Sequence, residues 1–119
     1  MSRDIFVQDI PEGIREVSEI PSDFMPEPLS QSHEQIVATI ERVAPTADFS
    51  DPEWGTIDGD TYSIEVNLKR TDPVRSFAFH VRASDDAADV VIAEILAALG
   101  LQAFDIDSDS GLFEPPTAG

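Results

Sequence analysis

The chain has 119 residues and carries 24 acidic against seven basic side chains, so its formal net charge is −17. Its length is typical of one domain, and its 41% hydrophobic residues suffice for a core. The absence of cysteine excludes disulfides, thiolate catalysis and cysteine-based zinc sites. Because so negative a chain repels phosphates and anionic membranes, we expect a basic protein surface as partner, with no direct nucleic-acid binding and no membrane.

The N-terminal sequence, MSRDIFVQDIPEG, has acids where a secretion signal needs an apolar run. No stretch approaches the roughly 18 apolar residues that a membrane span requires. Both observations predict a cytoplasmic protein.

Residues 1–29 are predicted to form an extended or irregular segment that begins with a strand at 3–10. Prolines further along exclude a long helix, although Ile14, Val17 and Ile20 have the spacing of one helical turn. We expect the segment to be fixed to the core by three apolar side chains, Phe24, Met25 and Leu29. The alternative is an arm that becomes ordered only on a partner.

Two helices are predicted further along. Ser32 and Gln35 form a capping box in front of a helical apolar pattern at 33–43. The second helix has Ser84 as its expected N-terminal cap, acids in its first turn and Gly100 to close it.

Period-two alternation of apolar and polar residues gives the strongest strand signals, at 61–68 and 77–82. A strand at 54–57 precedes them, and Asp58-Gly59 is a hairpin-turn signal between this strand and the next. A last short strand is expected at 101–106.

This order of elements predicts an α+β fold with two layers, in which two helices pack on one face of a mainly antiparallel sheet. We expect a single α+β domain over residues 1–113 and a flexible C-terminal tail at 114–119.

The other face of the predicted sheet is polar, and a flat polar surface suits contact with another protein. The candidate protein-binding residues are Trp54, Asp58, Asp60, Ser63, Glu65, Asn67, His80 and Arg82.

The position of Trp54 depends on the turn that follows its strand. A two-residue turn at Asp58-Gly59 pairs Trp54 with Ser63 and places the indole on the polar face. One extra residue, through a bulge at Gly59, turns the indole into the core, where tryptophan more often lies.

Catalytic and metal-binding patterns are weak. His80 lies opposite or diagonal to Glu65 in the expected hairpin, a pair that could act in acid–base catalysis but more often is a surface contact. Three alternating acids superficially resemble a calcium loop, yet the required glycine and glutamate are replaced by Ser110 and Pro116. The weak metal candidates are Asp105, Asp107 and Asp109. We therefore expect no catalytic residues, no metal and no cofactor.

Four segments, DIFVQDIP, APTADFSDPEWG, YSIEVN and SFAFHVR, together resemble small uncharacterised acidic proteins of bacterial genomes. The resemblance extends over residues 4–113. It implies a bacterial, cytoplasmic protein and brings no catalytic residues with it.

The leading hypothesis is a non-catalytic acidic module that binds a basic surface of a partner protein, for example an immunity-type protein or another inhibitor. One alternative is a DNA mimic, whose carboxylates replace phosphates on a nucleic-acid-binding protein. A second is a small enzyme that uses His80 and Glu65. The oligomeric state is left open.

Overall fold

The computed structural model describes residues 2–69 and 73–114. In chain order the elements are β1 (Ser2–Gln8), η1 (Val17–Glu19, a 3-10 turn), α1 (His33–Val43), β2 (Trp54–Asp58), β3 (Tyr62–Asn67), β4 (Ser76–Ala83), α2 (Ala87–Leu99) and β5 (Gln102–Asp105). The strands form one antiparallel sheet in the order β2-β3-β4-β1-β5. Of the predicted C-terminal tail, only Glu114 lies within the described residues.

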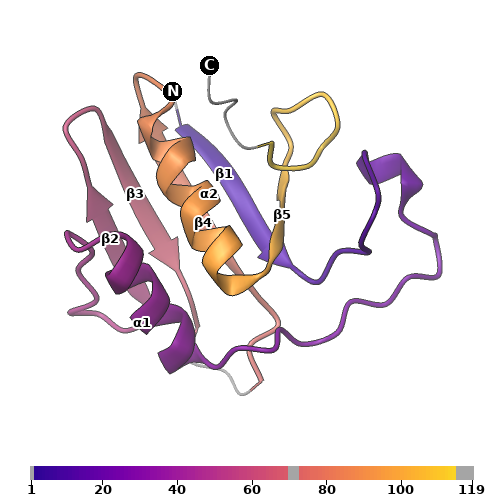
Figure 1. Ribbon diagram of the computed structural model, residues 1–119, viewed down its shortest axis with the longest axis horizontal. Coiled ribbons are helices and arrows are strands. Elements are labelled where there is room, and N and C mark those ends of the chain that lie inside the picture. Colours follow the sequence, from indigo (N-terminus) through magenta and orange to yellow (C-terminus); the bar gives the residue numbers. More distant parts are fainter. Residues whose placement is uncertain (1, 70–72, 115–119) are drawn as a thin grey trace.

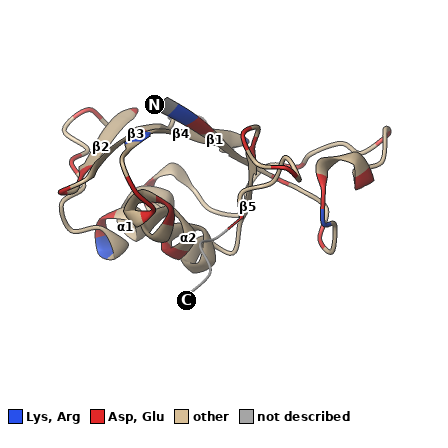
Figure 2. Ribbon diagram, turned by 90° about the horizontal axis from the view of Figure 1, so that it is seen from above, with Lys and Arg blue, Asp and Glu red and all other residues tan. Residues whose placement is uncertain are grey.

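Both helices lie on the same side of the sheet, as Figure 1 shows face-on and Figure 2 in profile. In the described part of the chain, no helix covers the opposite face. The predicted α+β fold, with two helices on one face of an antiparallel sheet, is confirmed.

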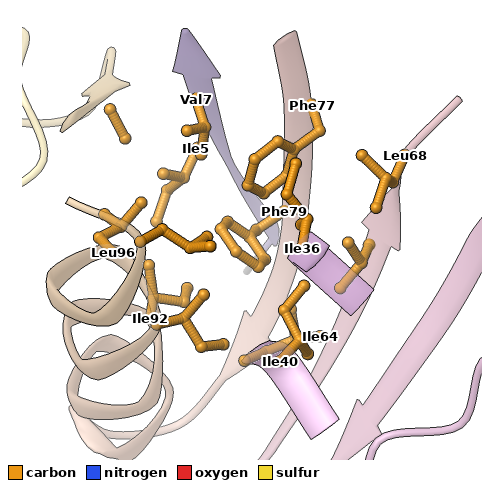
Figure 3. Close-up of a cluster of buried hydrophobic side chains, with 14 of the residues drawn as sticks. Ile5, Val7, Ile36, Ile40, Ile64, Leu68, Phe77, Phe79, Ile92 and Leu96 are labelled. Carbon is orange, nitrogen blue, oxygen red and sulfur yellow. The ribbon is translucent and has the colours of Figure 1, made fainter. Parts of the chain in front are cut away.

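The hydrophobic core fills the space between the sheet and the helices (Figure 3). Phe79 of β4 lies at its centre without exposed surface, and branched side chains of both layers surround it. Fully buried members include Ile5, Ile36, Ile40, Ile57, Ile64, Val66, Ile92 and Ile95. Each such side chain contributes about 1.5–3 kcal/mol when it leaves water, so the core dominates the stability of the fold.

The helix ends follow local chemistry. The capping box of α1 forms as predicted, with Ser32 accepting from Gln35 N–H and Gln35 accepting from Ser32 N–H. The prediction for the second cap is wrong, since α2 begins after Asp86 and the backbone N–H of Ser84 donates to the carbonyl of Thr61. This hydrogen bond holds Ser84 against the turn between β2 and β3, outside the helix. Gly100 ends α2 in the left-handed conformation, with φ of 68°, as its sequence position predicts.

The hairpin between β2 and β3 turns two residues later than predicted. Gly59 N–H donates to Tyr62 C=O at 2.9 Å, so the two-residue turn is Asp60-Thr61 and not Asp58-Gly59. A Cβ atom on Gly59 would lie 2.2 Å from the Tyr62 ring. Glycine is therefore needed here for the close approach of Tyr62, and it does not occupy the turn itself.

The segment between β1 and α1 extends beyond the β5 edge of the sheet (Figure 1). The predicted helical turn is present as η1, and Val17 N–H donates to Ser110 C=O at 2.8 Å. Leu29 is buried, and its N–H donates to Val74 C=O, so it fixes the segment as predicted. Phe24 is half-buried, but the prediction for Met25 is wrong because this side chain is 82% exposed.

Candidate functional site: the open face of the sheet

The register of the sheet places side chains of the uncovered face, called the open face below, in rows across the strands. One row contains Thr56, Glu65, His80 and Asp4, from β2, β3, β4 and β1 in that order. The row on one side of it contains Asp58, Ser63 and Arg82. The row on the other side contains Trp54, Asn67, Ala78, Phe6 and Phe104. The structure thus brings seven of the eight candidate residues onto one surface, while Asp60 lies in the adjoining turn.

Trp54 lies on this open face. It pairs with Asn67 and not with Ser63, because the turn is displaced. Shifting the two-residue turn by two positions shifts the pairing partner of Trp54 by four residues, from Ser63 to Asn67. Because four is an even number, the indole stays on the open face. Its ring stacks on His80 with a centroid separation of 5.7 Å and an interplanar angle of 24°. Since Trp54 and His80 are two strands apart, the indole crosses over β3, yet 41% of the residue stays exposed.

His80 is held on its other side by Asp4, a residue that sequence reasoning missed. The Nδ1 atom of His80 lies 2.6 Å from Oδ1 of Asp4, which is its neighbour across the β1–β4 ladder. An ionised carboxylate only accepts hydrogen bonds, so Nδ1 of His80 is the donor to Asp4. The β1–β4 pairing joins residues 76 positions apart. Neither periodicity nor turn length could have indicated it.

Glu65 lies directly opposite His80 in the β3–β4 ladder, one of the two arrangements expected from the sequence. No hydrogen bond or ion pair engages its carboxylate among residues 2–69 and 73–114. The two side chains instead line a shallow hollow of about 380 Å³ together with Asp4, Trp54, Ser63, Val81 and Arg82. The hollow therefore contains two carboxylates, one guanidinium and an indole wall.

The other candidates lie around this hollow. The hydroxyl of Ser63 donates to Oδ1 of Asp58 at 3.1 Å, so it is directed away from His80. Asp58, Asp60 and Arg82 are exposed, and Asn67 is half-buried. No ion pair within the described residues involves Arg82.

Phe6 is a second surface residue that the sequence did not indicate. It is 41% exposed, lies between Ala78 and Phe104 in the register, and extends the row of Trp54 toward β5. Period-two alternation within residues 3–10 places Phe6 opposite to Ile5 and Val7, a signal that could have found it.

Both edges of the sheet are closed by the chain itself. On β2, Thr56 exchanges two backbone hydrogen bonds with Asp48, and on β5, Phe104 forms a bridge with Leu112. The Asp48 loop is stabilised by Ser50, whose hydroxyl first and backbone N–H second lower the pKa of the Asp48 carboxyl. A partner that adds a strand needs free backbone groups, so the open face and not an edge is the accessible surface of the sheet.

The candidate metal ligands do not assemble a site. Asp105 is only 6% exposed; one of its oxygens lies 3.5 Å from Nε of Arg3 and the other accepts from Asp107 N–H at 3.0 Å. Arg3 also pairs with Asp89 in the first turn of α2. Asp107 and Asp109 are exposed, and no group of three or more His, Asp or Glu suited to a metal ion occurs in the described part of the chain.

Comparisons with known proteins give no further guide. No protein-family model, no curated protein and no solved structure matches this chain. Among the helices of the described residues, none has the length and apolar character needed to cross a membrane.

Proposed function

We propose that the chain is a non-catalytic binding module that engages a basic surface of a partner protein through the open face of its sheet. The observation that supports this most is the uncovered face itself, where Trp54 and Phe6 each leave 41% of their surface in solvent. Exposed aromatic side chains surrounded by polar groups are typical of interface anchors.

The charge of the chain supports the choice of partner. With a net charge of −17, long-range attraction accelerates encounter with a basic protein and slows encounter with nucleic acid or a second copy of this chain. An immunity-type protein, or another inhibitor that covers a basic functional surface, is the concrete form of the proposal. A cytoplasmic location belongs to the same proposal.

The geometry favours binding over the enzyme alternative. A hydrolase that used His80 would need a nucleophile hydrogen-bonded to Nε2, whereas the hydroxyl of Ser63 donates to Asp58. The stacked indole of Trp54 also covers part of the imidazole. The DNA-mimic alternative is less favoured because Arg82 lies among the carboxylates of the open face, where a row of phosphates has no counterpart.

Capture of the partner from a lysate of the cells that produce the protein tests the proposal. The immobilised chain is compared with Trp54→Ala, Phe6→Ala and a matched control, Val90→Ala, whose side chain is 46% exposed on α2. We expect the two open-face variants to lose about tenfold or more of the captured partner, and the control to retain it. High salt should weaken capture by the unaltered chain.

Equal capture by all three variants would contradict the proposal. Release of the captured protein by competing duplex DNA would instead favour the DNA mimic.

A further inference from the structure

We infer that the hollow beside Trp54 receives one arginine side chain of the partner. The inference rests on the proposed function, because it identifies the chemical group that the open face recognises. Three features of the hollow carry it: a carboxylate that no described residue engages, an aromatic wall and a fixed imidazole.

The carboxylate belongs to Glu65. It is half-buried in the middle of the sheet face, and no described residue forms a hydrogen bond or ion pair with it. A carboxylate accepts two parallel N–H bonds from a guanidinium, a charge-assisted contact that is stronger and more directional than a hydrogen bond between neutral groups. The cost of leaving water is smaller for a guanidinium than for an ammonium ion, which favours arginine over lysine.

The aromatic wall is the indole of Trp54, which crosses β3 beside Glu65 to reach His80. A guanidinium plane against an indole gains stacking and cation–π attraction. The hollow of about 380 Å³ is large enough for a single guanidinium and its stem.

The imidazole of His80 is kept in place by Asp4 and by the stack on Trp54. In the neutral tautomer that donates from Nδ1 to Asp4, Nε2 of His80 is a further acceptor for an incoming N–H group. Asp4, whose side chain is 47% exposed, adds a second negative charge at the hollow.

Arg82 provides an internal control, because it lines the same hollow with a positive charge. An incoming cation is repelled by Arg82 and attracted by Glu65, while an incoming anion experiences the opposite. The sign of the effect at each position therefore reports the charge of the occupant.

The test uses the full chain and the probe N-acetyl-Gly-Arg-Gly-amide at low ionic strength. Binding is followed by NMR through the indole N–H of Trp54, which is the single tryptophan. We expect Glu65→Gln to weaken binding about threefold to fivefold and Arg82→Gln to tighten it by a similar factor. Two controls carry the same changes of net charge at exposed helix positions, Glu94→Gln on α2 and Arg42→Gln on α1, and should leave binding unchanged.

Three further probes replace the arginine with citrulline, lysine or glutamate. The citrulline probe should not bind, and the lysine probe should bind more weakly than arginine. The inference is overturned if the arginine probe gives no shift, if Glu65→Gln and Glu94→Gln behave alike, or if the glutamate probe binds and Arg82→Gln weakens it. Lysine equal to or stronger than arginine overturns the assignment to a guanidinium. None of these outcomes bears on capture of the partner by Trp54 and Phe6, so the two proposals fail separately.

Discussion

The two faces of the sheet are formed by the same strands but differ in whether their side chains are buried or exposed. On β4, Phe79 points into the core without exposed surface, while His80 beside it lies on the open face in a stack with Trp54. The covered face gains its free energy from apolar contact, and Arg3 of β1 forms ion pairs there with Asp89 and Asp105. The open face carries exposed aromatic and charged groups, which we expect to contribute little to folding. The pleat of the strands thus separates the side chains that form the core from those of the open face, which we propose as the binding surface.

The largest expected effect comes from truncating a phenylalanine on the covered face, compared with truncating a phenylalanine on the open face. Phe79→Ala deletes a fully buried ring and should lower the free energy of unfolding by about 3–5 kcal/mol. Phe6→Ala, on the neighbouring strand but 41% exposed, should cost less than about 1.5 kcal/mol. Urea unfolding followed by circular dichroism measures both. Similar losses of unfolding free energy for the two variants would contradict the expected difference between the two faces.

A smaller effect is expected where a glycine makes room on the covered face. Gly55 is buried in β2, and a Cβ atom there would lie 2.4 Å from the ring of Phe49. Gly55→Ala should therefore force the ring aside and cost about 1–3 kcal/mol in urea unfolding. Thr56→Ala, at the next position and on the open face, is the control and should cost less than about 1 kcal/mol. A neutral or stabilising Gly55→Ala would mean that Phe49 moves freely.

Two arginines test the charges of the two faces. Arg3→Gln removes the ion-pair partner shared by Asp89 and Asp105, the latter a carboxylate that is only 6% exposed, and should cost about 1–3 kcal/mol. Arg82→Gln removes an exposed charge from the open face and should stay within about 0.5 kcal/mol of the unaltered chain. Thermal and urea unfolding at neutral pH compare them. An equal effect at both positions would show that burial of Asp105 does not depend on Arg3.

The smallest effect concerns the loop that leads from β4 into α2. The backbone N–H of Ala87 first, and the hydroxyl of Thr61 second, lower the pKa of the Asp85 carboxyl from its usual value of 3.8. A lowered folded pKa stabilises the protein above pH 3.8 and loses that contribution as the pH falls through the folded value. Asp85→Asn should therefore be less stable at neutral pH and should lose less stability than the unaltered chain on acidification below about pH 4. Parallel pH profiles of the urea midpoint for the two chains would contradict this.

Local patterns predicted what depends on local chemistry. Alternation located β3 and β4, the capping box located α1, and the order of the elements gave the two-layer α+β fold. The predicted position of the first hairpin turn was wrong because Asp58-Gly59 has the composition of a turn. In the structure, Gly59 instead donates its N–H to Tyr62 C=O and lies against the Tyr62 ring. Local composition cannot report such a contact.

The candidate site was predictable only in part, for a related reason. The pair Glu65 and His80 follows from the length of one hairpin, so its register could be narrowed to two choices. Asp4 joins His80 through the pairing of β1 with β4, which connects residues 76 positions apart in the sequence. The exposed fraction of Trp54 depends on its stack with His80, two strands away, and so required the assembled sheet.

The closed edges of the sheet affect how the specificity of the proposed binding could change. Because Thr56 on β2 and Ala103 and Asp105 on β5 already form backbone hydrogen bonds within the chain, a partner of the proposed kind would contact side chains alone. Those side chains alternate with core residues along each strand, so single substitutions can alter the recognised surface while the packing beneath stays intact. If the open face binds as proposed, such a scaffold would change partners one residue at a time, without refolding and without strand exchange between copies.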